Sequence, residues 1–347
     1  MDRSRVQVTV EALLSESRSK TVGENVRKTG TESTTTCRSG VSPNERHTGI
    51  IRAMPPWFRE HLACPDCLAP LVSEDAGTAC ACGFVIPAGV PPDLRPQHPA
   101  ERTLRVRVGS DAHDGLAATL VERPAITYSG PAAVRDSSEL FSAAAPWLKP
   151  GGRLLDLGCG PRDQAAPAAH YGLAYAGVDF TSDRADLRAD AHAIPFRDAT
   201  FDAVLSYAVF EHLYHPHLAA REVARVLKPG GVFFGAVSLG EPFHDSYFHH
   251  SALGLLSILA DSGLRAVRLW SSYDTLHALS TMGRYPKVQR MLIEAVYRFG
   301  TAFPFLAPRK YFRWSEREKA VDALHRAASV CFVVERTVER TVEKVVR

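Results

Sequence analysis

Short apolar runs alternate with helical stretches from residue 139 onward. Runs typical of buried strands occupy residues 153–158, 174–180, 185–189, 201–207 and 231–238. Before the last of them, Leu218, Val223, Val226 and Leu227 share one face of an amphipathic helix that we expect to end at residues 229–231. Strands that alternate with helices favour a parallel sheet covered on both faces. The pattern therefore predicts an α/β domain over residues 136–340.

The pattern changes after residue 250. Residues 251–264 predict an amphipathic helix, residues 266–270 a strand, and residues 328–338 a final β-type run. Between the last two strands, residues 273–327 are mostly helical in pattern and rich in aromatic residues. Such an insert is longer than a connection requires, and long inserts usually carry specificity. We expect this helical insert to cap a substrate site.

The part of the chain before this domain divides into three. Residues 1–53 are rich in Ser, Thr, Arg and Glu and predict a disordered tail, and Met54 is a candidate native start. Residues 57–95 contain four clustered cysteines and predict a small domain, and residues 96–135 read as a linker.

The net charge of +3 is confined to the tail. Residues 1–53 hold nine basic and six acidic side chains, whereas residues 54–347 hold 32 of each. A neutral body argues against a protein whose whole surface grips a polyphosphate backbone. The longest near-apolar stretches fall well short of the ~20 residues needed to cross a bilayer, and the first 30 residues carry no apolar signal core. We expect a cytoplasmic protein without a transmembrane segment.

A glycine turn follows the first predicted strand. Asp156 ends that strand, and Gly158 and Gly160 would let a ligand approach the backbone closely. Asp179 ends the second strand and Asp190 the third. A dinucleotide site would need a third glycine where Asp163 stands, and an acid beside the turn suits a cationic ligand better than a pyrophosphate.

These residues resemble a class I S-adenosylmethionine-dependent methyltransferase of the ubiquinone/menaquinone type. The resemblance is carried by residues 156–160, Asp179, residues 190–191, 201–204, 211–213 and 227–231. It implies a Rossmann-like seven-stranded sheet that ends in an antiparallel strand, and S-adenosylmethionine as cofactor. It further implies a cofactor site made of Asp156, Gly158, Cys159, Gly160, Asp179, Phe180, Asp190, Ala191 and Ser206. Arg162 departs from the pattern, because many members have a further glycine there.

A general base is needed only if the acceptor is protonated at pH 7. Tyr207 and His212 follow the fourth strand, whose end borders the transferred methyl group in this family, and His244 follows the fifth. His212 belongs to a common family segment and could instead serve as a structural residue. We take His244, His212 and Tyr207 as the catalytic candidates.

The cysteine cluster predicts a metal site. Cys64 and Cys67 form one pair, and Cys80 and Cys82 the other. Four thiolates can close a tetrahedral structural zinc site. The pattern resembles the Trm112-like zinc ribbon, although the second pair is C-x-C where C-x-x-C is usual.

Two classes of acceptor remain open. The neutral body and the aromatic insert favour a small molecule such as a sugar, lipid or natural product, including an anionic or lipid-linked one. The alternative is RNA, because residues 284–319 interleave nine basic and three acidic side chains with aromatic rings. The same segment could form a solvated helix face.

Overall fold

The computed structural model of the protein describes residues 54–71, 80–87, 89–98, 138–241, 245–272, 274–302 and 315–337. The predicted tail at residues 1–53, most of the predicted linker at residues 96–135, and the candidate catalytic residue His244 lie outside the described residues.

A seven-stranded sheet forms the centre of the domain, in the order β3-β2-β1-β4-β5-β7-β6. Its strands are β1 (Arg153–Leu157), β2 (Ala174–Asp179), β3 (Leu187–Arg188), β4 (Phe201–Tyr207), β5 (Leu227–Ser238), β6 (Leu264–Ser271) and β7 (Ser329–Arg336). Strands β1 to β5 pair in parallel, and β7 runs antiparallel between β5 and β6. The prediction of a seven-stranded sheet with an antiparallel final strand is confirmed.

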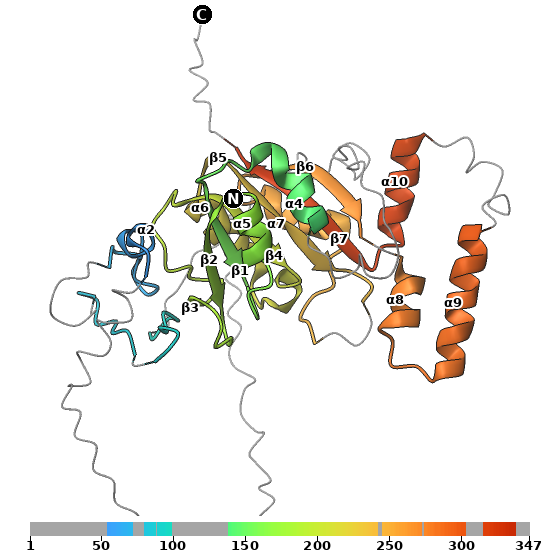
Figure 1. Cartoon of the computed structure of the whole chain (residues 1–347), viewed down its shortest axis with the longest axis horizontal. Helices are drawn as coiled ribbons and strands as arrows, with labels where there is room; N and C mark the ends of the chain where they lie inside the picture. Colours follow the sequence, from blue (N-terminus) through green and yellow to red (C-terminus); the bar gives the residue numbers. More distant parts are fainter. Residues whose placement is uncertain are drawn as a thin grey trace, which may run out of the picture. The chain divides into compact units, whose positions relative to one another are not determined.

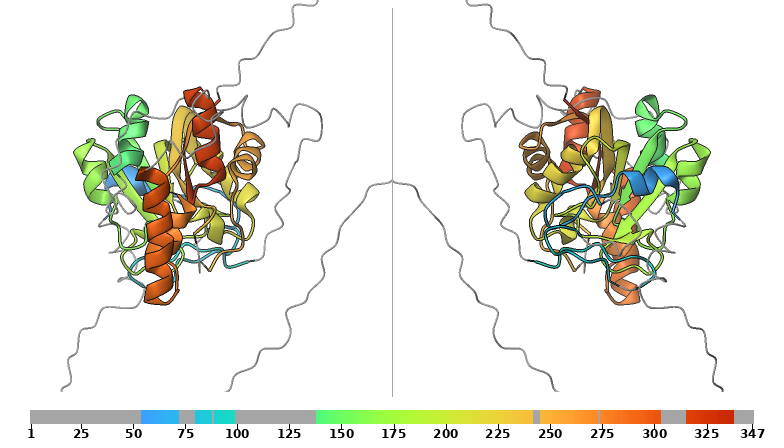
Figure 2. Two further views of the ribbon diagram at one scale, coloured as in Figure 1. Left: turned by 90° about the vertical axis from the view of Figure 1, so that its right-hand side faces the viewer. Right: turned by 90° about the vertical axis from the view of Figure 1, so that its left-hand side faces the viewer.

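Helices cover both faces of the sheet, because alternate strand residues point to opposite sides. On one face Leu155 packs in a cluster with residues of α6 (Pro216–Val226), α7 (Ala252–Ala260) and α10 (Glu316–His325). On the other face Leu154 packs with α4 (Ser138–Ala144) and α5 (Ala165–His170). Figure 2 shows helices on either side of the strands. This double covering explains why the strands read as nearly continuous apolar runs.

Three helices occupy the insert between β6 and β7: α8 (Thr275–Thr281), α9 (Lys287–Ala302) and α10. Asp274 caps α8 by accepting a hydrogen bond from the N–H of Leu276, and Ser315 forms a capping box with Glu318 at the start of α10. Figure 1 shows α8 and α9 side by side beyond the β6–β7 end of the sheet. No helix within the described ranges is long and apolar enough to cross a membrane.

The cysteine-containing segment extends the sheet at its β3 edge. The N–H of Leu94 donates to the carbonyl of Arg188 at 2.8 Å, and the N–H of Arg188 donates to the carbonyl of Pro92 at 2.9 Å. Phe58 of α2 (Pro56–Glu60) packs against Phe196, with ring centroids 5.1 Å apart. The segment thereby covers backbone groups that would otherwise form an open sheet edge.

Three predicted elements differ in extent. The strand expected at residues 185–189 pairs only at Leu187–Arg188. The helix expected at residues 139–148 ends at Ala144 and continues as a 3-10 turn, Ala145–Trp147. The glycines at residues 230–231 lie within β5 instead of beyond a helix end, because α6 already ends at Val226.

Candidate functional site

The first βα turn lies at the point where the strand order reverses between β1 and β4, which is where open α/β sheets bind ligands. Gly158 has φ of +78°, and a Cβ added there would lie 2.3 Å from Cγ2 of Val209. The N–H groups of Gly158 and Cys159 both donate to the carbonyl of Val178, at 2.8 and 3.0 Å. Gly158 is thus required by both backbone conformation and space, and its turn is hydrogen-bonded to the end of β2.

Arg162 keeps the left-handed backbone that a glycine would adopt easily, with φ of +69°. Such a conformation costs roughly 1–2 kcal/mol for a residue with a Cβ. The guanidinium group is ion-paired with Asp186 and lies 5.1 Å from the ring centroid of Tyr175. Asp186 in turn accepts a hydrogen bond from the N–H of Gly177 at 2.8 Å. These contacts offset the backbone cost and fasten the turn to β2.

Asp156 is buried at the end of β1, with 1% of its surface exposed. Its Oδ2 accepts a hydrogen bond from the hydroxyl of Tyr175 at 2.6 Å. Burial raises the pKa of Asp156 to about 7, despite the opposing effect of the Tyr175 hydrogen bond. A buried carboxyl of this kind gains most from a cationic partner, which a sulfonium and ammonium cofactor would supply.

Asp179 is tied to the glycine turn. Its Oδ2 accepts the N–H of Gly160 at 2.9 Å, and its Oδ1 accepts the N–H groups of Thr181 and Ser182, both at 2.8 Å. Burial alone would raise the pKa of Asp179, but these hydrogen bonds outweigh it and hold the pKa below its usual value. The carboxylate is therefore ionised and fixed in orientation, as a ribose-binding acid must be.

The third acid borders the loop after β3. Asp190 Oδ1 accepts from the N–H of His192 at 2.9 Å and contacts Nδ1 of the same residue at 2.6 Å. Burial opposes ionisation, but the His192 hydrogen bonds outweigh it, so the pKa of Asp190 is lowered. Ala191 beside it is buried, whereas the Phe180 ring is half exposed with the Arg95 guanidinium 5.1 Å from its centroid. Of these two residues, only Phe180 leaves substantial apolar surface exposed.

Two other members of the predicted cofactor site are buried beside the turn. Ser206 lies at the end of β4, and its Oγ has no hydrogen-bond partner among the described residues. Cys159 is buried, and burial raises the pKa of its thiol to about 12, which disfavours the thiolate.

The catalytic candidates after β4 have different surroundings. Tyr207 is half-buried and packs against the α4 side of the core. His212 is exposed on the 3-10 helix η4 (Phe210–His212), and its Nδ1 lies 2.5 Å from the carbonyl oxygen of Asp245. The neighbouring Glu211 is fully buried, and burial raises its pKa to about 7.

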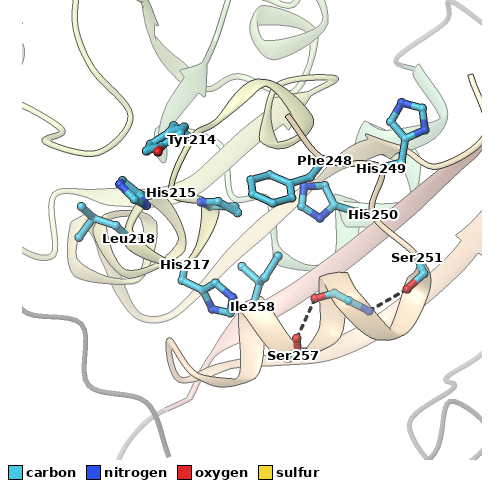
Figure 3. A pocket seen from close by; sticks show the side chains of 12 residues that line it. Tyr214, His215, His217, Leu218, Phe248, His249, His250, Ser251, Ser257 and Ile258 are labelled. Atoms are coloured by element: carbon cyan, nitrogen blue, oxygen red, sulfur yellow. Dashed lines mark hydrogen bonds between the residues drawn. The ribbon is translucent and has the colours of Figure 1, made fainter. Parts of the chain in front are cut away.

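Packing also creates a cavity of about 700 Å³ that sequence reasoning missed. It lies between the segments that follow β4 and β5, and Figure 3 shows its side chains. The lining consists of Tyr214, His215, Pro216, His217, Leu218, Phe248, His249, His250, Ser251, Gly254, Ser257 and Ile258. The clustering of histidines was visible in the sequence, but the cavity depends on α6 and α7 packing together.

One histidine of this cavity has a carboxylate behind it. His217 Nδ1 lies 3.8 Å from Asp261 Oδ2 and has no hydrogen-bond partner in the described part of the chain. His215 connects the cavity to the third acid, because its N–H donates to Nε2 of His192 at 3.1 Å. The cavity and the row of acids therefore share the carboxyl edge of the sheet.

The four predicted metal ligands converge. The sulfur atoms of Cys64, Cys67, Cys80 and Cys82 all lie within 4.8 Å of one another, with Cys64–Cys82 at 3.5 Å and Cys67–Cys80 at 3.4 Å. Tetrahedral zinc with Zn–S bonds of about 2.3 Å holds its sulfurs about 3.8 Å apart. The short C-x-C pair still forms a closed turn, since the N–H of Gly83 donates to the carbonyl of Cys80 at 2.9 Å. The donor set fits a structural zinc ion.

The strand order, the glycine turn and the acids at successive strand ends define a Rossmann-like fold. Residues 155–235 match the family model described as a methyltransferase domain, which confirms the resemblance inferred from the sequence. S-adenosylmethionine is the cofactor of this class of methyltransferase.

Several proteins similar to this chain are named as sterol or quinone methyltransferases. The chain is 25% identical over 197 residues to the sterol 4-C-methyltransferase strm-1 of Caenorhabditis elegans, covering 51% of this chain and 57% of that protein. It is 29% identical over 151 residues to the demethylmenaquinone methyltransferase of Renibacterium salmoninarum, covering 37% and 63%. It is 36% identical over 112 residues to the ubiquinone biosynthesis O-methyltransferase of Caulobacter vibrioides, covering 27% and 43%. The matches thus span less than two thirds of each relative.

Solved structures with similar folds are more distant in sequence. They include the [4+2]-cyclase SpnF, at 23% identity and a TM-score of 0.37 over 58% of this chain and 81% of that one. Another is an S-adenosylmethionine-dependent methyltransferase from Mesorhizobium loti, at 17% identity and a TM-score of 0.38 over 58% and 100%. The fold assignment rests on the strand order and pairing described above.

Proposed function

We propose that the protein transfers the methyl group of S-adenosylmethionine to a small-molecule acceptor. The observation that carries this proposal is the row of Asp156, Asp179 and Asp190 along the carboxyl edge of the sheet, beside a glycine turn within the matched residues 155–235. The relatives named above are a sterol methyltransferase, a demethylmenaquinone methyltransferase and a ubiquinone biosynthesis methyltransferase. Because the matches cover only part of each relative, they support the class of reaction and do not identify one acceptor.

Each residue of the cofactor site has a physical role in this proposal. The turn at residues 158–160 gives the cofactor close access to the backbone, Asp156 faces its positive charge, and Asp179 accepts hydrogen bonds from ribose. Phe180, Asp190 and Ala191 border the base, and Ser206 offers a buried hydroxyl at the end of β4. The bound cofactor supplies an already activated methyl group, so the protein mainly has to orient the acceptor, which can contribute about 7–11 kcal/mol in favourable cases.

The cavity beside η4 is our candidate for the acceptor site. Its volume of about 700 Å³ lies in the usual range for small-molecule pockets, about 300–1,000 Å³. Phe248, Leu218 and Ile258 supply apolar surface, while His217 supplies an imidazole whose Nδ1 lies 3.8 Å from Asp261 Oδ2. We therefore favour an acceptor with an apolar body and a hydroxyl group, such as a lipid, sugar conjugate or natural product. His217 joins His212, Tyr207 and His244 as a candidate base.

We also propose that the four cysteines hold a structural zinc ion. The metal would fix the segment that pairs with β3 and that carries Arg95 to the ring of Phe180. Zinc would thereby support the base-binding end of the cofactor site without entering the reaction.

The central experiment is transfer of labelled methyl from S-adenosylmethionine by the purified protein into host extract, fractionated into lipids, small molecules and RNA. Label in the lipid or small-molecule fraction supports the proposal, and label confined to RNA supports the alternative. Calorimetry should show cofactor binding that Asp179→Ala abolishes. Asp183→Ala is the matched control, because that side chain is 79% exposed at the same strand end. Equal loss of binding in both variants would contradict the assigned ribose site.

A further inference from the structure

Helix α9 has two different faces, and polar contacts determine which face turns toward α8. Glu294 Oε2 accepts a hydrogen bond from the hydroxyl of Ser280 at 2.6 Å, and Arg290 Nε donates to the carbonyl of Ser280 at 2.8 Å. The Tyr297 ring lies 5.2 Å from the His277 ring. These contacts fix the rotation of α9 about its own axis, so the opposite face must point away from α8.

That opposite face is apolar. Its exposed members are Val288, Met291, Leu292, Val296 and Phe299, with exposed fractions between 55 and 68%. At about 100° per residue, these positions fall within an arc of about 140°. Ala295, which also falls in the arc, is uncharged. An apolar stripe on a helix normally packs against a core, so a stripe exposed on this scale indicates a binding surface.

Basic side chains border the stripe. Residues 284–302 contain four exposed basic residues, Arg284, Lys287, Arg290 and Arg298, and a single acid, Glu294. Of these bases, Arg290 contacts α8, and Arg298 is ion-paired with Glu294 at 2.6 Å. Lys287 and Arg298 lie along one margin of the apolar arc by the same helical spacing, and Arg284 precedes the helix. An apolar face bordered by basic residues is complementary to a surface that has an apolar interior beneath an anionic outer layer.

We propose that α9 docks the protein on the surface of an anionic lipid bilayer. An amphipathic helix lying in the plane of such a surface buries its apolar face at the headgroup boundary while Lys and Arg contact acidic headgroups. A helix of 16 residues is about 24 Å long, which suits a position along the surface. Single-stranded nucleic acid fits less well, because it stacks on aromatic rings and this face is mainly aliphatic.

The position of α9 allows this contact. It packs on α8 in the insert between β6 and β7, beyond the last strands of the sheet (Figure 1). The cofactor turn lies at the end of β1, on the other side of β4 and β5 in the sheet order. The inference does not depend on methyl transfer, because docking can be measured without cofactor or acceptor.

The test is flotation of the full chain with vesicles at physiological salt. Vesicles of phosphatidylcholine with 30% phosphatidylglycerol are compared with phosphatidylcholine alone. We expect anionic vesicles to bind at least tenfold more protein, and raising the salt to weaken this binding. The proposal would be overturned if the protein bound neither kind of vesicle.

Two variants assign the surface. Leu292→Glu with Val296→Glu should reduce vesicle binding at least tenfold, and Lys287→Glu should reduce it severalfold. Leu253→Glu is the control, because Leu253 is 50% exposed on α7. Unchanged melting temperature and circular dichroism will show that each variant is folded.

Other outcomes would overturn the proposal. Binding by the double variant equal to that of the unmodified chain would remove α9 from the interface. If the unmodified chain forms a concentration-dependent dimer but does not bind vesicles, and the double variant does not dimerise, the apolar face would be assigned to contact with a second copy of the chain. If the unmodified chain binds RNA but not vesicles, and the double variant loses the RNA binding, the apolar face of α9 would be assigned to nucleic acid.

Discussion

The ionisation of Asp156 provides the sharpest test of the site. In the folded chain burial raises its pKa from 3.8 to about 7. Between about pH 4 and pH 7 the unfolded chain has lost the proton that the folded chain keeps. The folded state then binds more protons, so the contribution of this group to stability falls as pH rises through that window. The difference in pKa corresponds to about 4 kcal/mol, at about 1.4 kcal/mol for each tenfold change in proton affinity.

Replacing Asp156 with asparagine removes this penalty and retains an oxygen that accepts the Tyr175 hydroxyl. The unfolding free energy of Asp156→Asn, relative to the unmodified chain, should therefore rise by up to about 4 kcal/mol from pH 4 to pH 8. Cofactor binding should move in the opposite direction, weakening at least tenfold at pH 8, because the ionised carboxylate that faces the cation is gone. Denaturant titrations at several pH values and calorimetry measure the two effects.

Two comparisons make the experiment decisive. Glu211 ionises in the same pH range, so only the difference between variant and unmodified chain can be assigned to Asp156. Asp179→Asn is the control, because the pKa of Asp179 is lowered and its contribution to stability is lost only below about pH 4. A stability difference for Asp156→Asn that does not change with pH would refute the reasoning.

Three further predictions concern the turn, the metal and the cavity. Gly158→Ala should destabilise the protein by more than the roughly 1–2 kcal/mol expected from φ alone, because the new methyl group meets Val209. Gly230→Ala is the control, because Gly230 has a similar φ but open space around it. Equal denaturation midpoints for the two variants would count against the steric explanation. Purified protein should contain about one zinc ion per chain. Cys67→Ser or a chelator should release the zinc and weaken cofactor binding. A zinc content near zero in the unmodified protein would rule out the site. Once an acceptor is known, His217→Ala should lower kcat by about 100-fold or more if His217 acts as the base. Cofactor affinity measured by calorimetry should not change. Unchanged kcat in the variant would exclude this role.

Much of the cofactor site could be predicted from short stretches of sequence. The glycine turn and the acids at the ends of β1, β2 and β3 are local features, since each lies within a few residues of a recognisable apolar run. The same holds for the four cysteines, whose spacing alone indicated the cluster that the structure brings together. Strand limits were less predictable where pairing decides them, as at β3, where only Leu187–Arg188 join the ladder.

Other features depend on residues that are distant in the sequence. The cavity exists because the start of α6 and the start of α7 leave space between them, and no local pattern encodes that space. Arg162 could be recognised as a departure from the usual glycine, but its compensation by Asp186 and Tyr175 required the packing of the turn on β2.

The sequence by itself determined the order of the elements, the class of domain and the residues that carry the chemistry, because secondary-structure periodicity and turn chemistry are set by neighbours along the chain. Tertiary structure alone decided how those residues behave. Asp156 has a pKa near 7 because strands and turn together exclude water from it, and the apolar face of α9 is exposed because the opposite face is held by α8. Burial and exposure arise from the whole fold, and so they could not be deduced from any one segment.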